Sequence, residues 1–199
     1  CKRDIIDLVH PELEGYRQQF EQITKDAADL VAGLSEEEFN WRPAPGEWSV
    51  EECLAHLTMV GQVELEHIES AIENARSRGL TGSGPFEYSA LERLLMRETE
   101  PPNRHSTTTP KRFTPLHNQP VTAVLPTFNH VQSMFILNIE RADGLDLRRV
   151  KVVTPITRFL KISLGMTFAQ AAAHERRHLA QARRVRAKLP KGVPLPATH

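Results

Sequence analysis

The chain has 199 residues, of which 40% are hydrophobic and 25% charged, as is usual for a water-soluble globular protein. Lys plus Arg and Asp plus Glu both number 25, so the formal net charge is zero, which argues against a protein built mainly to hold nucleic acid or an anionic membrane. No stretch is long and apolar enough to span a bilayer.

Two cysteines, Cys1 and Cys53, are too few and too poorly placed for a disulfide framework, which favours a reducing, cytoplasmic location. Cys1 is compatible with methionine removal, with a boundary of the expressed sequence or with the acylated terminus of a lipoprotein. We favour the first two explanations, because nothing after it resembles an extracellular linker.

The first long helix is predicted to begin near His10, with Pro11 in its first turn, and to end at Gly33. Its apolar residues recur at alternating steps of four and three, which makes one seam, as in a helix of a bundle. These residues are Val9, Leu13, Tyr16, Phe20, Ile23, Ala27 and Leu30.

Ser35 and Glu38 have the spacing of a capping box, which predicts a short helical turn. Residues 42–47 contain two prolines and a glycine and are predicted to form a loop. Ser49 and Glu52 repeat the capping box at the start of a second long helix.

The second long helix is expected to run to about Arg78 and to stop at Gly79. Residues 79–126 are punctuated throughout by Gly, Ser, Thr and Pro, and we interpret them as an irregular cover over one end of the domain. A short helix is predicted inside this segment from about Ser89 to Glu98.

The third long helix is predicted to start near Pro126 and to end around Asp143. Residues 147–162 are ambiguous, and 150–153 could be extended. A fourth long helix is predicted with Thr167 as its N-cap, and Pro190 ends it.

Four long amphipathic helices without a convincing series of strands predict an all-α fold, an up-and-down four-helix bundle. The irregular insertion lies between the second and third long helices. We expect one domain over residues 1–190, including the 79–126 cover, followed by a flexible tail at 191–199.

The candidate chemistry lies in His174 and His178, because imidazoles four residues apart lie on one face of a helix. His56, in the second long helix, lies as far beyond its predicted cap, Ser49, as His174 lies beyond Thr167. If the two helices run parallel with aligned ends, as in an up-and-down bundle, the three imidazoles meet at one level.

Three neutral imidazoles suit a divalent transition metal, with Zn²⁺ first and Ni²⁺ or Fe²⁺ as alternatives. Three protein ligands leave one position open, which indicates an enzyme acting on a small molecule. A metal there lowers the pKa of a bound water or thiol. The alternatives are a non-catalytic bundle that binds a small ligand or partner around a structural metal, and isolated helical histidines that bind no metal.

The same residues also spell H-E-x-x-H, the pattern in which zinc proteases use the Glu as general base. Such enzymes take a third ligand downstream, and here only His199 follows in the tail, so this hypothesis is the weakest. Glu175 is nevertheless a candidate catalytic base or ligand-orienting residue. Cys53, three residues before His56, is a candidate fourth ligand, although a buried Cys is more often packing.

The other histidines receive different interpretations. His67 is too far along its helix to share an ion with His56, whereas His130 could line the cavity. His105 and His117 could reach over the site as a lid. Trp41 and Trp48 are expected to pack in the core. The basic residues of the last helix are expected to form a solvated face, and the alternative is a pocket for an anionic substrate.

Three motifs occur in the order seen in one known family. They are Trp41-Arg42-Pro43-Ala44-Pro45-Gly46-Glu47-Trp48-Ser49-Val50, His56-Leu57 and His174-Glu175-Arg176-Arg177-His178-Leu179-Ala180-Gln181. In these the chain resembles the DinB/YfiT-like superfamily of candidate metalloenzymes, which are four-helix bundles with one His from the second helix and an H-x-x-x-H pair from the fourth.

The resemblance covers nearly the whole chain and implies His56, His174 and His178 as metal ligands. It also implies a homodimer. Characterised relatives include bacillithiol S-transferases, a mycothiol-dependent maleylpyruvate isomerase and the thiol-binding part of ergothioneine-forming enzymes. The expected function is therefore a metal-dependent S-transferase that uses a low-molecular-weight thiol, or a hydrolase.

Overall fold

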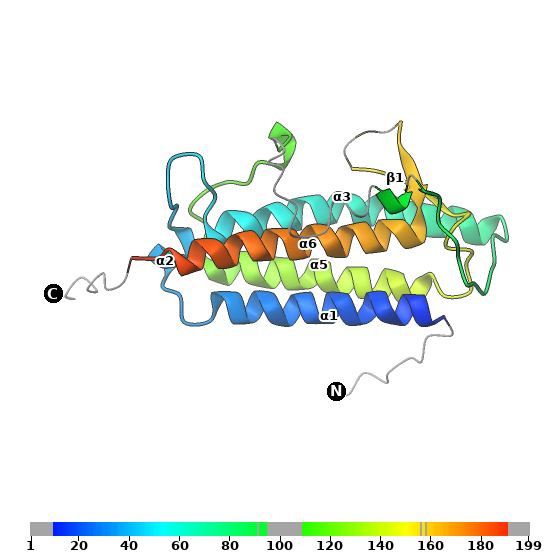
Figure 1. Ribbon diagram of the computed structural model, residues 1–199, viewed down its shortest axis with the longest axis horizontal. Helices are drawn as coiled ribbons and strands as arrows, with labels where there is room; N and C mark the ends of the chain where they lie inside the picture. The colour runs from blue at the N-terminus through cyan, green and yellow to red at the C-terminus, as the bar shows by residue number, and fades with distance from the viewer. Residues whose placement is uncertain (1–9, 91, 95–108, 156, 158, 191–199) are drawn as a thin grey trace.

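Four long helices pack side by side as a bundle in the computed structural model, which describes residues 10–90, 92–94, 109–155, 157 and 159–190 (Figure 1). Each of the four contacts two of the others. They are α1 (Pro11–Val31), α3 (Val50–Ser77), α5 (Val121–Arg141) and α6 (Leu164–Ala187). The predicted four-helix bundle with an irregular segment between its second and third long helices is confirmed.

Local capping explains where the early helices begin. The His10 ring accepts a hydrogen bond from the amide of Glu12 at the start of α1, and Pro11 takes the first helical position. Both predicted capping boxes form, Ser35 with Glu38 at α2 (Glu36–Asn40) and Ser49 with Glu52 at α3.

The helices do not simply alternate in direction. The last turns of α3 and α5 lie together, since the Arg76 guanidinium donates to the carbonyl of Arg141, so these two helices run parallel. The end of α6 lies at the start of α3, where Lys188 Nζ is 3.4 Å from Glu47 Oε2, so α3 and α6 run antiparallel (Figure 1). The strict up-and-down order expected from the sequence, with α3 and α6 parallel, is therefore wrong.

The reason is the length of the segment between α3 and α5. A helix of the length of α3 spans roughly 40 Å, and the irregular segment returns over this distance to the end where α3 began. There the Asn40 side chain donates to the carbonyl of Gln119, just before α5. A crossover of this kind lets consecutive long helices point the same way.

Two predicted helix starts were also wrong. Helix α5 begins at Val121 rather than near Pro126, because the Glu36 carboxylate accepts from the Val121 amide and caps the helix from a distant element. Helix α6 begins at Leu164 rather than after Thr167. The Thr167 hydroxyl instead donates to the carbonyl of Ser163, one turn back inside the helix.

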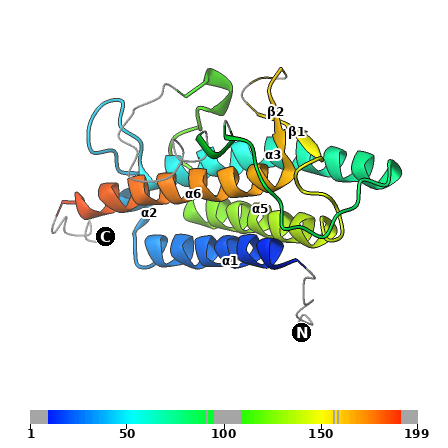
Figure 2. The same cartoon turned by 45° about the vertical axis from the view of Figure 1, so that its right-hand side comes forward.

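A small hairpin feeds directly into α6. Strands β1 (Lys151–Val153) and β2 (Lys161–Ser163) pair antiparallel, which confirms the extended alternative for 150–153 (Figure 2). His67 Nδ1 on α3 lies 2.9 Å from the carbonyl oxygen of Val153 and holds the hairpin against the bundle.

The irregular segment carries a short 3₁₀ helix, η1 (Lys111–Phe113), and a capped turn at Ser89 and Glu92. Part of the helix predicted from Ser89 to Glu98 lies outside the described residues. The tail at 191–199 and the first nine residues of the chain lie outside them entirely. None of the described helices is long and apolar enough to cross a membrane.

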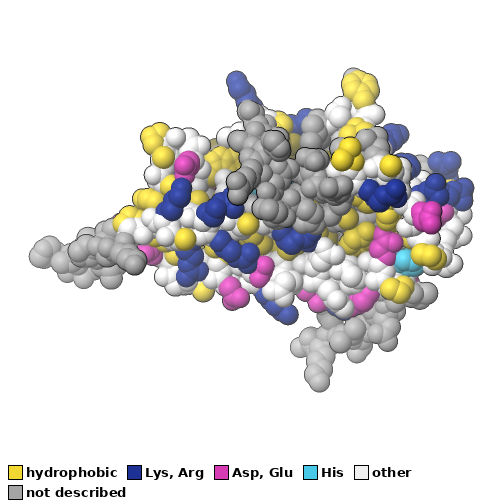
Figure 3. Space-filling model, viewed as in Figure 1, with side chains coloured by type: hydrophobic (Ala, Val, Ile, Leu, Met, Phe, Trp, Pro, Cys, Tyr) yellow, Lys and Arg dark blue, Asp and Glu magenta, His cyan; other side chains and the backbone are white. Residues whose placement is uncertain are grey.

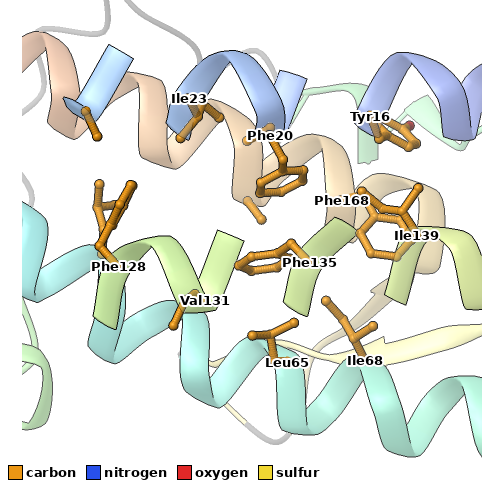
Figure 4. Close-up of a cluster of buried hydrophobic side chains, with 14 of the residues drawn as sticks. Tyr16, Phe20, Ile23, Leu65, Ile68, Phe128, Val131, Phe135, Ile139 and Phe168 are labelled. Carbon is orange, nitrogen blue, oxygen red and sulfur yellow. The ribbon is translucent and has the colours of Figure 1, made fainter. Parts of the chain in front are cut away.

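Aromatic and branched side chains from all four helices fill the core (Figure 4). The Phe20 ring of α1 stacks on Phe135 of α5 at 4.6 Å between centroids, and Tyr16 packs against Phe168 of α6 at 5.9 Å. Gly61 lets α3 approach α5 closely, because a Cβ there would lie 2.7 Å from Val131 Cγ1.

We expect Gly61→Ala to leave the protein less stable than the control variant Gly15→Ala. Both changes gain roughly 1 kcal/mol of helix propensity, and a Cβ at Gly15 meets nothing within 4 Å. At Gly61 the added methyl must displace Val131, which overpacks the core by about 1–3 kcal/mol. Urea denaturation of the two variants measures the difference, and equal free energies of unfolding would contradict this account of the α3–α5 contact.

Candidate metal centre

The antiparallel packing of α3 on α6 brings together the three histidines singled out in the sequence. His56 lies in the first third of α3, and His174 and His178 lie near the middle of α6. The convergence was predicted, but the reasoning behind it assumed parallel helices with Ser49 and Thr167 as matching caps. The meeting instead results from opposed helix directions, which place the start of α3 beside the end of α6.

One ring nitrogen from each histidine lies within 4.8 Å of the other two. The ring centroids of His56 and His178 are 4.6 Å apart, those of His174 and His178 4.7 Å, and those of His56 and His174 5.4 Å. Nitrogens bonded to one zinc ion at roughly 2 Å lie at most about 4 Å apart. Small side-chain rotations therefore suffice to bring all three onto a common ion.

Hydrogen bonds orient two of the three rings. His56 Nδ1 lies 2.9 Å from the carbonyl oxygen of Phe113 in η1, and His178 Nδ1 lies 3.0 Å from Gln181 Oε1. Because a carbonyl oxygen can only accept, the Nδ1 atom carries the proton in both rings. The Nε2 lone pairs of His56 and His178 are then free to bind a metal, which is the usual arrangement of metal-binding histidines.

Burial keeps the imidazoles neutral. Loss of solvation, reinforced by the neighbouring imidazoles, lowers the pKa of His174 to about 3 and that of His178 to about 2. Burial also lowers the pKa of His56, although the hydrogen bond that its ring donates to the carbonyl of Phe113 acts in the opposite direction. Neutral imidazoles are the form that ligates a metal, so no proton need leave the site before an ion enters near neutral pH.

Trp48, just before the cap of α3, forms a wall of this site. Its ring centroid lies 4.9 Å from that of His56 and 5.8 Å from that of His178. It is half-buried and also packs on the core, as expected. The contact of Trp48 with the histidines was not predicted, and neither were the hydrogen bonds of Phe113 and Gln181 to the two rings. Gln181 stands three residues after His178, a helical spacing that could have revealed it.

Glu175 is almost fully buried and belongs to a different face of α6. Its Oε1 accepts a hydrogen bond from the Gln132 side chain of α5 at 3.1 Å, and burial raises its pKa to about 8. Its other oxygen has no partner within the described part of the chain. None of the described hydrogen bonds or ion pairs joins Glu175 to the three histidines, so its catalytic role stays a prediction.

The remaining candidates lie elsewhere. Cys53 is fully buried with a raised thiol pKa, and it does not join the histidine cluster found among the described residues. His117 lies against the carboxylates of Glu51 and Glu52, at 3.9 and 3.7 Å. His130 is exposed on α5, and His105 and His199 lie outside the described residues.

A helical bundle in which two helices contribute three buried, neutral imidazoles is the architecture of a candidate metalloprotein. Comparison with known families makes this more specific. The sequence profile of the DinB superfamily matches residues 19–182, which include all three histidines, and the chain belongs to this superfamily. No curated protein sequence matches the chain.

The lowered pKa values predict how acid affects the metal-free protein. A histidine with a folded pKa far below 6.5 binds its proton only on unfolding, so stability is full above pH 6.5 and falls as the pH drops toward the folded pKa. Between pH 6.5 and pH 5, the free energy of unfolding of wild type should fall by about 1–2 kcal/mol more than that of His174→Gln, at about 1.4 kcal/mol per pH unit.

Denaturant unfolding in chelator at several pH values measures this loss, with His130→Gln, an exposed histidine, as the matched control. Buried carboxyls with raised pKa, such as Glu175, oppose the trend, but they are common to all three proteins and cancel in the comparison. Parallel pH profiles for wild type and His174→Gln would show that the imidazole is not held neutral by the fold.

Proposed function

We propose that this protein is a metal-dependent enzyme in which His56, His174 and His178 hold one divalent transition metal. The observation that carries the proposal is the convergence of three ring nitrogens from two helices within 4.8 Å. Imidazole donors favour Zn²⁺ first, with Ni²⁺ or Fe²⁺ as alternatives. A small-molecule substrate, a homodimer and a cytoplasmic location complete the proposal.

The donor set supports an open site. Among the residues that the structure describes, no fourth His, Cys, Asp or Glu joins the cluster. A structural zinc site is normally closed by four protein ligands, whereas a catalytic site keeps a position for water or substrate. This favours an enzyme over the alternative, a non-catalytic bundle with a structural metal.

The residues around the metal centre favour a thiol-dependent S-transferase. When bound, a divalent metal with three neutral ligands supplies a positive charge that lowers the pKa of a thiol or water in the open position. A thiol held beside His56, His174 and His178 would react as its thiolate and displace a leaving group from an electrophilic carbon. The new S–C bond replaces the bond to the leaving group, which departs with its electron pair, and the thiol proton passes to solvent.

The protein supplies position and exclusion of water in this reaction. Phe113 and Gln181 fix the orientation of two imidazoles, and Trp48 covers one side of them. A thiolate is a nucleophile in its own right and needs no separate general base. The zinc-protease alternative uses a glutamate as general base, and Glu175 contacts Gln132 of α5 instead. A hydrolase needs only the hydroxide that a metal would supply, so it remains the alternative to thiol transfer.

Purified protein is expected to bind about one zinc ion per chain, and His56→Ala should lower the affinity at least a hundredfold, because it removes one of three ligands. His67→Ala, on the same helix but bonded to the hairpin, is the matched control and should keep the metal. Metal analysis after dialysis against a graded chelator measures both. Full metal content in a variant that lacks both His56 and His174 would reject the site.

Glu175→Gln separates the thiol-transfer reaction from the zinc-protease alternative. We expect it to retain thiol conjugation to within about threefold, since the amide preserves the shape of a side chain that contacts Gln132. The assay follows loss of a low-molecular-weight thiol in the presence of an alkylating electrophile, with chelator-treated protein as the blank. A loss of a thousandfold or more, together with cleavage of a peptide library by wild type, would favour the protease instead.

A further inference from the structure

Arg177 stands between two of the proposed ligands on α6 and has a different environment from its basic neighbours. It follows His174 by three residues, about one helical turn, and directly precedes His178 in the chain. It is half-buried, and its positive charge contributes to the lowered pKa of His56, His174 and His178. Arg177 therefore stands beside both α6 histidines, and a side chain of its length can reach the metal centre.

Other arginines of α6 are committed to α1. Arg183 pairs with Asp26 at 2.8 Å, and Arg186 donates to the carbonyls of Asp29, Leu30 and Ala32. Arg176 donates to Gln19. Arg177 forms no hydrogen bond or ion pair with any residue that the structure describes. Figure 3 shows Lys and Arg side chains spread over this face of the molecule, along α6.

None of the acidic side chains that the structure describes pairs with Arg177. The Glu52 carboxylate pairs with Arg42, and the Glu51 side chain accepts from Gln119. Glu175 lies on the face toward α5, and burial raises its pKa to about 8, so it is mainly neutral at pH 7. None of these carboxylates neutralises Arg177.

A partly desolvated guanidinium beside a divalent ion is unfavourable unless an anion accompanies both. Burial lowers the pKa of Arg177, which is the expected sign of this lost solvation. Three imidazoles bring no negative charge. The site therefore has an excess of positive charge that the described side chains do not balance.

We propose that Arg177 binds an oxyanion, a carboxylate or phosphate group, on the small molecule that occupies the open position of the metal centre. This inference rests on the proposed function and adds a substrate class to it. A guanidinium binds both oxygens of such a group in a planar pair of hydrogen bonds, which a lysine cannot reproduce. The ligand of this site is then an anionic molecule with a second group that reaches the metal.

The test compares two thiols of similar size on cobalt-loaded protein, whose visible absorption bands shift when a thiol enters. Wild type should bind 3-mercaptopropionate at least tenfold more tightly than 2-mercaptoethanol. Arg177→Gln should reduce this preference to within twofold while its cobalt content and its affinity for 2-mercaptoethanol stay unchanged. Arg177→Lys should recover part of the preference, and Arg184→Gln, an exposed arginine two turns further along the helix, should behave as wild type.

A second measurement makes the inference independent of the metal. In chelator-treated protein, millimolar inorganic phosphate should raise the thermal midpoint of wild type and of Arg184→Gln, but not that of Arg177→Gln. Failure to bind cobalt would overturn the proposed function, and the phosphate arm would still decide whether Arg177 binds an anion. A preference for 3-mercaptopropionate that survives in Arg177→Gln, or no preference in wild type, would overturn the inference.

Discussion

The opposed directions of α3 and α6 are the constraint on which the candidate site depends. Because these helices run antiparallel in contact, the first third of α3 faces the middle of α6, and His56 meets His174 and His178 there. The long crossover before α5 is what allows this arrangement, so the irregular segment contributes to the site even where it does not touch it.

Much of the fold follows from local patterns. The seam of α1 and the capping boxes at Ser35 and Ser49 depend on spacing within a few residues, and they formed as predicted. The direction of the helices could not be predicted in this way, because it depends on how a segment rich in Gly and Pro crosses the bundle. The start of α5 was missed because its cap, Glu36, comes from another element.

For the site as well, local spacing could be predicted from the sequence, whereas contacts between distant elements could not. The i, i+4 spacing of His174 and His178 predicts that the two side chains share one face of a helix. The structure adds that His56 lies beside them, which makes a cluster of three imidazoles. The carbonyl of Phe113 has no side-chain signature, so no sequence pattern could place it on His56. The surroundings of Glu175 could not be predicted either, because its partner Gln132 lies on α5, far from the H-E-x-x-H motif in the sequence.

The bond between His56 and Phe113 joins the bundle to the segment that crosses it. Any ligand that holds the His56 ring in its bonded orientation also stabilises the docked position of η1, and by thermodynamic reciprocity the docking of η1 strengthens ligand binding by the same factor. Occupancy and accessibility of the centre are then linked properties. We therefore expect a bound ligand to protect the backbone around residue 113 from hydrogen exchange.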